Sequence, residues 1–330
     1  MANTQTYQPP FSITSKVLNL VSEISAEVAK LEILEPKVMT PTLRKDYKIK
    51  TITGTLEIEG NTLGIEKVTA ILEGKRVLGS VREIAEVQGA IKVYDYLEKF
   101  NYKKLDDLLL AHKMLMDEIL KNAGSFRTKD VGVGGSDGVV HVAPPSMQVH
   151  NLMVDLFSWL KETDIHPLIQ SCIFHYEFEF IHPFSDGNGR IGRLWQTLIL
   201  HKYKPVFSAI PVESVIKEHQ QEYYKALEDS GSVGESTPFI EFMLEIILDT
   251  IKNSLDNDQV NDYVSDQVEK LLDVMNSEWL SSSEIMEMLE LSHKPTFRKN
   301  YLNPALEHGL IEMHNPDSPR SPKQKYRIKR

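Results

Sequence analysis

Apolar residues recur at intervals of three and four along most of this chain, a spacing that gives an α-helix one buried face. Stretches that alternate apolar and polar residues, as strands do, are few. The pattern therefore predicts an all-α fold. The predicted helices cover residues 17–32, 81–100, 105–120, 147–160, 168–180, 191–201, 218–227 and 238–255.

Composition narrows the class of protein further. The 330 residues are 41% hydrophobic and 25% charged, as in ordinary globular proteins, and this length suggests two or three domains. The one cysteine, Cys172, excludes an intramolecular disulfide and a cysteine zinc site. The first ten residues do not resemble a secretory signal, and no apolar run approaches the roughly 18 residues of a membrane helix. We therefore expect a cytoplasmic protein with no membrane attachment.

Charge is distributed unevenly along the sequence. The net charge is −10, yet residues 293–330 contain nine Lys and Arg against three Asp and Glu, a local charge of +6. The acidic body argues against general affinity for nucleic acid, whereas the basic end permits such affinity locally. A solvated basic tail would explain the same charge.

Glycines interrupt the helical pattern between residues 124 and 145. Gly132, Gly134, Gly135 and Gly138 separate two short β-branched stretches, which predicts a hairpin. A nucleotide-binding P-loop is excluded because the segment lacks Gly-Lys-Ser/Thr and no helix start follows it.

Residues 260–330 are predicted to form a separate small module. Its predicted elements are helices at 260–275, 284–291 and 294–308, a C-cap at Gly309, and paired strands at 311–314 and 325–328. Three helices followed by a two-stranded ribbon resemble a winged helix-turn-helix. Arg298 and Lys299 lie on the third helix, where DNA-binding proteins place phosphate and base contacts. Modules of this shape also serve in dimerisation and protein docking.

The most informative segment runs from Phe178 to Arg193, where an apolar helix passes into a tight polar loop and then into another helix. Gly187 and Gly189 allow the backbone to turn sharply and to approach a ligand closely. Their amide groups and the start of the following helix form an anion site. Arg190 adds a fixed cation, and Arg193 lies three residues further along the same helix face.

Two further side chains complete the chemistry of this segment. Asp186 is a hard oxygen ligand beside the anion site, which suits Mg²⁺ bridging phosphates. His182 can accept a proton near neutral pH. Each residue alone is more often structural, and His175, Glu179 and His182 lack the spacing of a zinc protease. A base, a metal ligand and a phosphate site within twelve residues together predict phosphoryl or nucleotidyl transfer.

These residues match one signature at every fixed position. From His182 to Arg193 the chain contains His-Pro-Phe-x-Asp-Gly-Asn-Gly-Arg-x-x-Arg, and in this it resembles the Fic family. Other stretches extend the resemblance from about Pro9 to Leu255, namely Pro9–Phe11, Gly124–Arg127, Pro144–Pro145 and Tyr223–Leu227. The resemblance implies a helical Fic core with a short β-hairpin flap, followed by the winged-helix module. The domains it implies are 1–110 with an inhibitory motif, 111–255 as catalytic core, and 260–330.

The resemblance also implies a reaction, the transfer of AMP from ATP to a Ser, Thr or Tyr hydroxyl of a target protein, with Mg²⁺ present and pyrophosphate released. His182 would deprotonate the hydroxyl, and Asp186 would hold Mg²⁺ on the α- and β-phosphates. The nucleotide would be bound by an anion hole and two arginines, which are Gly187, Asn188, Gly189, Arg190 and Arg193. Phe184 would pack beneath the loop as a core residue. The target chain would pair with the flap strand formed by Val140, His141 and Val142.

A second segment, Thr55-Leu56-Glu57-Ile58-Glu59-Gly60-Asn61, resembles the inhibitory motif of the family, Ser/Thr-x-x-x-Glu-Gly/Asn. With Thr55 at a helix start and Gly60 at its end, Glu59 would stand on a short rigid element. Its carboxylate would pair with Arg193 and occupy the cation that the γ-phosphate needs. The resemblance therefore implies an autoinhibited enzyme.

Two departures from the family pattern affect finer assignments. Gly89 stands where relatives often have Asn after a Glu-Val pair, and residues 227–231 lack an amide side chain that some relatives place near adenine. Tyr224 is still expected to border the base. The sequence leaves open the target, self-modification, a homodimer and DNA binding by the last module. It also leaves open the removal of AMP, with Glu59 positioning a water, and a donor other than ATP.

Overall fold

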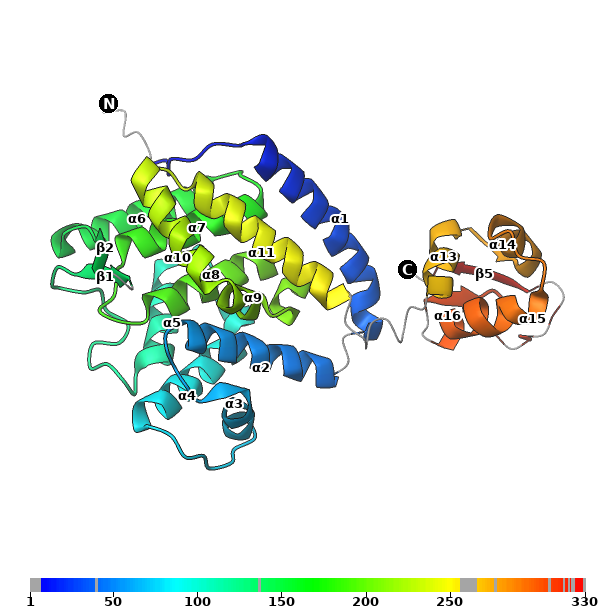
Figure 1. Cartoon of the computed structure of the whole chain (residues 1–330), viewed down its shortest axis with the longest axis horizontal. Coiled ribbons are helices and arrows are strands. Elements are labelled where there is room, and N and C mark those ends of the chain that lie inside the picture. The colour runs from blue at the N-terminus through cyan, green and yellow to red at the C-terminus, as the bar shows by residue number, and fades with distance from the viewer. Residues whose placement is uncertain are drawn as a thin grey trace. The chain divides into compact units, whose positions relative to one another are not determined.

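A computed structural model describes residues 7–38, 41–135, 138–255, 266–275, 278–307, 310–316, 318–319, 321 and 324–328. The chain divides into two compact units, Met1–Glu32 with Pro41–Lys252, and Ile33–Thr40 with Asn253–Arg330. The first unit is largely helical and contains the motif segments (Figure 1). The predicted division at 1–110, 111–255 and 260–330 stays a prediction. Within the described residues, no helix is long and apolar enough to cross a membrane.

The helices predicted from apolar spacing are confirmed, with ends that shift by up to six residues. They are α1 (Ser15–Val38), α4 (Val81–Asp95), α5 (Leu105–Met116), α6 (Ser146–Glu162), α7 (Pro167–Ile181), α8 (Asn188–Tyr203), α10 (Gln220–Val233) and α11 (Thr237–Leu255). A 3₁₀ turn, η1 (Leu97–Lys99), follows α4. Ser80 begins α4 with a capping box, because its hydroxyl accepts from the Glu83 amide and the Glu83 side chain reaches back to Ser80.

The spacing pattern missed three further helices in the first unit. They are α2 (Pro41–Ile58), α3 (Gly64–Leu72) and α9 (Val212–Glu218), with a short 3₁₀ turn, η2 (Pro205–Ala209), before α9. The second half of α2 is buried on nearly every side, including the polar residues Thr51, Thr53 and Thr55, so it shows no one-sided apolar pattern. Thr55 lies in the last turn of this long helix, and its predicted place at a helix start is wrong.

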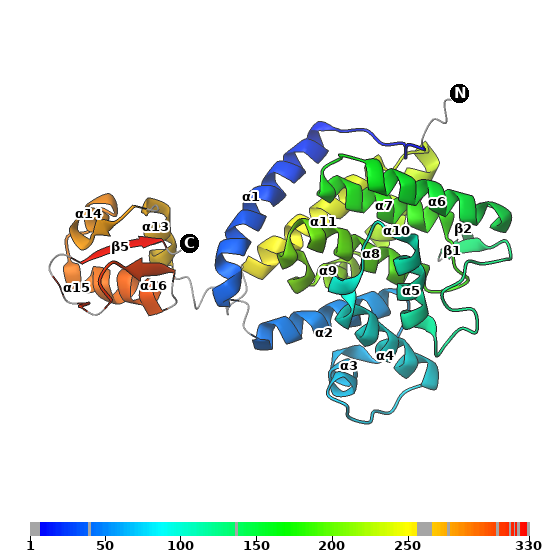
Figure 2. The same ribbon diagram turned by 180° about the vertical axis from the view of Figure 1, so that it is seen from behind.

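α7 and α8 form the buried centre of the first unit. All residues of α7 from Leu168 to Phe178 and all of α8 from Arg190 to Leu200 are buried. The remaining helices lie around this pair in both views, with α1 alongside α11 (Figure 1, Figure 2). Fully burying one large apolar side chain stabilises a fold by about 1.5–3 kcal/mol. The loop between α7 and α8 therefore joins two helices of the buried core.

α2 packs closely on α9 where the inhibitory motif begins. A Cβ on Gly54 would lie 2.8 Å from the backbone of Glu213, so only glycine permits this approach. Glu213 in turn accepts hydrogen bonds from the hydroxyls of Tyr94, at 2.9 Å, and Thr197, at 3.0 Å. These contacts fix the end of α2 against α4, α8 and α9.

The predicted hairpin is present as β1 (Gly132–Gly135) paired antiparallel with β2 (Gly138–Val142). The register shifts between Val133 and Gly134. The predicted docking residues Val140, His141 and Val142 lie on β2. The side chains of Val140 and His141 lie outside the described residues, whereas Val142 is exposed.

The second unit contains short helices and a three-stranded antiparallel sheet. The helical elements are α13 (Asp266–Val274), α14 (Ser282–Met288), α15 (Lys294–Phe297), a π-helical turn η3 (Arg298–Leu302) and α16 (Asn303–Glu307). The strands, in their order across the sheet, are β3 (Leu280–Ser281), β5 (Lys325–Ile328) and β4 (Ile311–Met313). The apolar core of the second unit includes Val268, Leu271, Ile285, Phe297 and Leu302.

The ribbon of β4 and β5 confirms the predicted strand pair, with Met313 opposite Tyr326. The prediction missed β3, because two residues carry too little pattern to show a strand. Arg298 and Lys299 are exposed on η3. Residues 260–265 and Gly309 lie outside the described residues.

Candidate active site

The candidate active site is built on the loop between α7 and α8. α7 ends at Ile181, and His182 adopts the left-handed conformation with φ 49° and ψ 60°. This conformation costs a residue with a Cβ about 1–2 kcal/mol. Gly187 adopts a second left-handed conformation, φ 84°, directly before α8 begins at Asn188. The two turns bring the amino end of α8 beside the carboxyl end of α7.

Arg127 holds the strained part of this loop. Its side chain is buried, and its Nε donates to the carbonyl oxygen of His182 at 2.8 Å. Its Nη2 donates to the carbonyl oxygen of Pro144 at 2.5 Å. The backbone amide of Arg127 donates to the carbonyl oxygen of Pro183 at 2.9 Å. One buried cation thus joins the motif loop to the chain that leaves the flap, and this fixes the orientation of His182.

His112 supports the loop from α5. Its ring stacks on Phe184, with centroids 3.7 Å apart and planes at 3°, and Phe184 is fully buried as predicted. The amide of Gly124 donates to Nδ1 at 2.8 Å, so Nε2 carries the proton and donates to the carbonyl oxygen of Asp186 at 3.0 Å. Burial lowers the pKa of His112 to about 4, which keeps the ring neutral in this role.

Asn188 closes the loop with its side chain. Its Oδ1 accepts from the amide of Phe184 at 2.8 Å, and its Nδ2 donates to the carbonyl oxygen of the same residue at 2.9 Å. Because the amide side chain is used in this way, Asn188 can contribute to an anion site only through its backbone N–H.

His182 lies beside a buried carboxyl group. Its Nδ1 is 3.8 Å from Oε2 of Glu179, which precedes it by three residues at the end of α7. Burial raises the pKa of Glu179 to about 8, and the charge of Glu59 adds to the rise. The side chain of His182 remains 22% exposed, so its ring can meet a hydroxyl group that enters from solvent.

Arg193 is enclosed at the start of α8, with only 1% of its side chain exposed. Its Nε donates to Oγ1 of Thr55 at 2.9 Å, and its Nη2 donates to the carbonyl oxygen of Thr55 at 3.0 Å. Nη2 also donates to Oε1 of Glu59 at 2.8 Å. The predicted contact between Glu59 and Arg193 is therefore present, and we call these two residues the inner pair.

The carboxylate of Glu59 reaches over the first turn of α8. The chain after Glu59 turns at Gly60, which has φ 85°. A Cβ on Gly189 would overlap Oε1 of Glu59 and would lie 3.0 Å from Nη1 of Arg193. Glycine at position 189 thus lets the carboxylate lie against a helix N-terminus, which is the place where an anion is most favoured.

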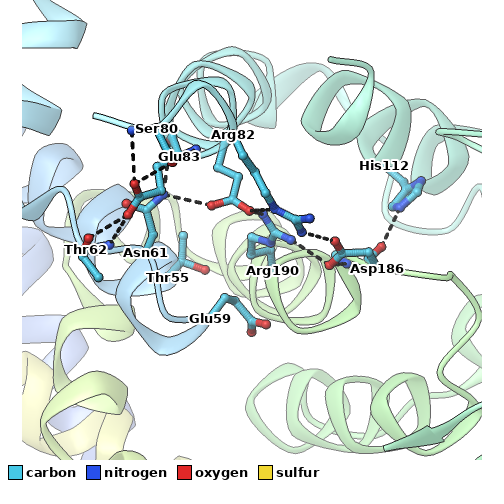
Figure 3. Close-up of polar contacts among 12 residues, drawn as sticks. Thr55, Glu59, Asn61, Thr62, Ser80, Arg82, Glu83, His112, Asp186 and Arg190 are labelled. Atoms are coloured by element: carbon cyan, nitrogen blue, oxygen red, sulfur yellow. Dashed lines mark hydrogen bonds and ion pairs between the residues drawn. The ribbon is translucent and has the colours of Figure 1, made fainter. Parts of the chain in front are cut away.

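A second ionic group surrounds Asp186 (Figure 3). Its Oδ2 accepts from Nη2 of Arg82 at 2.6 Å, and we call Arg82 and Asp186 the outer pair. Its Oδ1 accepts from Nη2 of Arg190 at 3.0 Å and from the amide of Gly187 at 2.6 Å. The side chain of Arg82 is 62% exposed, whereas that of Arg190 is only 3% exposed.

Glu86 connects the outer pair to the segment that contains Glu59. Its Oε1 lies 3.3 Å from Nε of Arg82 and 3.4 Å from Nη1 of Arg190. Its Oε2 accepts from Nδ2 of Asn61 at 2.9 Å. Because Asn61 follows Glu59 by two residues, hydrogen bonds link that segment to the carboxylate of Asp186.

The buried arginines fit the phosphate groups of a nucleotide. Nη1 of Arg193 and Nε of Arg190 are buried and have no hydrogen-bond partner among the described residues. Such donors are rare in folded proteins because each costs about 1–3 kcal/mol when it stays unpaired. Phosphate oxygens would satisfy them together with the amides at the start of α8.

A divalent cation fits the site only in company with phosphates. No group of three or more metal-binding side chains occurs among the described residues. Asp186 would therefore hold Mg²⁺ jointly with phosphate oxygens, which is the usual manner of this ion at nucleotides.

Tyr224 lies on α10 beside the end of α2. Its hydroxyl donates to the carbonyl oxygen of Ile58 at 3.2 Å, and Nε2 of Gln220 donates to the same oxygen at 2.8 Å. The residue is 47% exposed, so one side of its ring is open to a ligand. Its contact with adenine stays a prediction.

Three residues that organise this site, Arg127, His112 and Arg82, were not predicted from the sequence. Arg127 belongs to a stretch that resembles the family, which was the one available signal. His112 and Arg82 reach Asp186 across 74 and 104 residues of chain, and no local pattern marks such contacts.

The site thus combines a histidine on a strained loop with two buried arginines at a helix N-terminus. Residues 102–200 match the Fic/DOC family, and residues 266–329 match the C-terminal domain of the filamentation induced by cAMP protein Fic-like. The crystal structure of a Fic family protein from Desulfovibrio desulfuricans G20 is similar over 98% of this chain and 98% of that one, with 48% sequence identity and a TM-score of 0.75. The chain therefore belongs to the Fic family.

Similar proteins with named activities are longer than this chain. Protein adenylyltransferase Fic of Aedes aegypti is 31% identical over 214 residues, which are 61% of this chain and 40% of that protein. Protein adenylyltransferase fic-1 of Caenorhabditis elegans is 30% identical over 249 residues, which are 70% of this chain and 45% of that protein. The chain thus spans less than half the length of these curated relatives. A structure of Fic-1 from C. elegans covers 74% of this chain and 73% of its own at 23% identity, and its TM-score of 0.61 shows the same fold.

Proposed function

We propose that this chain transfers AMP from ATP to a hydroxyl group of a protein, and that Glu59 restrains the reaction. The observation that supports this best is the partly exposed His182 beside two buried arginines whose free N–H groups suit phosphates. One loop then supplies both a base and a polyphosphate site. The relatives named protein adenylyltransferase support the same reaction.

In the proposed reaction, His182 accepts the proton of the target hydroxyl while the hydroxyl oxygen forms a bond to the α-phosphorus of ATP. The bond from that phosphorus to the bridging oxygen of the β-phosphate breaks, and pyrophosphate leaves. Arg190 and Arg193 stabilise the charge on the phosphates, with the amides of Asn188 and Gly189. Bound Mg²⁺ at Asp186 would neutralise further phosphate charge.

The proposed target segment is an extended chain that pairs with β2. β2 pairs with β1 on one side, and the structure shows no strand on its other side among the described residues. An extended segment could add there through backbone hydrogen bonds, which tolerate many side chains. A Ser, Thr or Tyr of the target, or of a second copy of this chain, would then reach His182.

The proposed restraint works by competition for Arg193. Glu59 accepts an N–H of this arginine that a γ-phosphate would need, and it lies where the anion site is most positive. A charge-assisted hydrogen bond contributes about 1.5–3 kcal/mol, which corresponds to roughly 10- to 100-fold in occupancy. ATP would bind in a productive geometry only after Glu59 moves away.

The test is transfer of label from α-³²P ATP with Mg²⁺, in buffer and in cell lysate. We expect weak labelling of protein by the wild type and labelling roughly 10- to 100-fold stronger by Glu59→Gly. His182→Ala should remove the label in either background, because the target hydroxyl loses its base. Initial rates measured on gels would give these ratios.

Glu57→Gly is the matched control for the brake. It introduces the same residue two positions earlier, in the last turn of α2, without touching Arg193, so its labelling should equal that of the wild type. Equal labelling by Glu59→Gly and wild type would contradict autoinhibition. No label in any variant would contradict AMP transfer from ATP. Other nucleotides as donors and removal of AMP from a modified protein would then be examined.

A further inference from the structure

We propose that Arg82 competes with the divalent cation for Asp186 and thereby sets how much the metal contributes to nucleotide binding. In this role Arg82 is a positioning residue, because it acts through Asp186 and touches no reacting atom. The inference rests on the proposed function in one respect, namely that Asp186 holds the metal beside the phosphates.

The two oxygens of Asp186 have different partners. Oδ1 accepts from the amide of Gly187 at 2.6 Å and from Arg190 at 3.0 Å. Oδ2 accepts from Arg82 at 2.6 Å, and the described residues offer it no second hydrogen bond. Oδ2 is therefore the oxygen that a metal ion can take, and the guanidinium of Arg82 already lies against it.

The two arginines also differ in their freedom to move. Arg190 is buried on α8 and lies between Asp186 and Glu86, so its guanidinium cannot leave without breaking the core. Arg82 is in the first turn of α4 with 62% of its side chain exposed. It can rotate into water at small cost, and its Nε can stay near Glu86, now 3.3 Å away.

A guanidinium and a divalent cation at one carboxylate oxygen repel each other, and the double charge of the metal ion doubles that repulsion. Because Arg82 can rotate into water, we expect it to leave Oδ2 when the metal binds, and the lost contact is subtracted from the affinity of the metal. We expect removal of Arg82 to raise the affinity for the metal roughly 3- to 30-fold. The effect is limited because exposed ion pairs contribute little, and it is enlarged because this pair lies beside the buried charge of Arg190.

The experiment measures binding rather than catalysis. In the full chain carrying Glu59→Gly and His182→Ala, calorimetric titration gives the affinity for ATP with Mn²⁺ and with EDTA, and their ratio is the metal gain. We expect Arg82→Gln to raise the metal gain roughly 3- to 30-fold over its parent. Arg82→Lys keeps a cation that can reach Oδ2 and should stay near the parent.

Arg76→Gln is the matched control. It removes another exposed arginine six residues earlier and should leave the metal gain unchanged. Melting temperatures within a few degrees of the parent would show that each variant is folded. Asp186→Asn should abolish the metal gain, since it removes the proposed ligand.

The outcomes separate the two proposals. An unchanged or reduced metal gain in Arg82→Gln, together with a loss in Asp186→Asn, would overturn the role of Arg82 and leave the proposed function intact. A metal gain that survives Asp186→Asn would overturn both the role of Asp186 as metal ligand and the role of Arg82 as its competitor. Absence of ATP binding in every variant would overturn the proposed function and, with it, this inference.

Discussion

The inner pair and the outer pair occupy two regions of one helix start, yet they are built differently. In the inner pair the cation is buried, since Arg193 is 1% exposed and has two more contacts to Thr55. In the outer pair the cation is exposed, since Arg82 is 62% exposed and meets the carboxylate from another helix. When the inner pair separates, Glu59 must move, because Arg193 is buried. When the outer pair separates, Arg82 can move into water, and Asp186 stays in place.

The two pairs would respond differently to water and salt. Coulomb attraction is weakly screened where water is excluded and strongly screened at the surface. The inner pair therefore suits a strong brake on the nucleotide. The outer pair suits a weaker adjustment that responds to the concentration of metal ion and salt.

The largest expected effect concerns Arg193, the partner of Glu59 and the proposed binding residue for phosphate. In the Glu59→Gly background, Arg193→Gln should lower transfer of label by about 100-fold, because a buried charged hydrogen-bond donor is lost. Arg82→Gln in the same background should change the rate by less than about threefold at saturating Mg²⁺. Initial rates at fixed ATP measure both.

Comparable losses in these two variants would break the comparison, because the exposed arginine would then bind phosphate as well. A melting curve of Arg193→Gln is the necessary control, since this side chain also holds Thr55 through two hydrogen bonds.

A smaller effect is expected from salt. Raising ionic strength from about 0.1 M to 1 M shortens the screening length from about 10 Å to about 3 Å. The difference in metal gain between wild type and Arg82→Gln should then shrink to less than about twofold. The ratio of labelling between Glu59→Gly and wild type should change little. If high salt reduced the labelling ratio as strongly as the difference in metal gain, the inner pair would be accessible to solvent.

The smallest effects are expected on stability, with opposite pH dependence at the two regions. His112, beside Asp186, has a pKa lowered by burial to about 4, so the fold should lose stability as pH falls from about 6.5 toward 4. Glu179, beside Arg193, has a pKa raised by burial to about 8, so the fold should lose stability as pH rises from about 4.5 toward 8. Each contribution should appear as a slope of the melting temperature against pH within its range.

Two variants assign these slopes to their residues. His112→Gln should flatten the acid side of the melting profile, and Glu179→Gln should flatten the neutral and basic side. A slope that persists in the corresponding variant would show that another group causes it.

Much of the fold and the central motif could be predicted from the sequence. Apolar residues at three- and four-residue spacing marked most of the helices, including the buried α7 and α8, and glycines marked the hairpin. The same logic failed for α2, because polar residues occupy buried positions in its second half. The start of the inhibitory element at Thr55 was therefore misplaced, although its contact through Glu59 with Arg193 was predicted correctly.

The supporting contacts of the site could not be predicted in this way. His112, Arg127 and Arg82 act on backbone or side-chain atoms that lie 55 to 104 residues away along the chain. Residue spacing reports on neighbours within one helix or strand, and it contains no information on which helix packs against which.

The sequence by itself determined the chemical groups and their local order: a base, a carboxylate, glycines and two arginines within twelve residues, and a glutamate after a helix. Local order suffices there because the groups share one loop and one helix turn. Only the tertiary structure decided which arginine is buried and which is exposed. Burial depends on the packing of α2, α4, α5 and α8 around the loop, and it is burial that makes the inner pair rigid and the outer pair exchangeable.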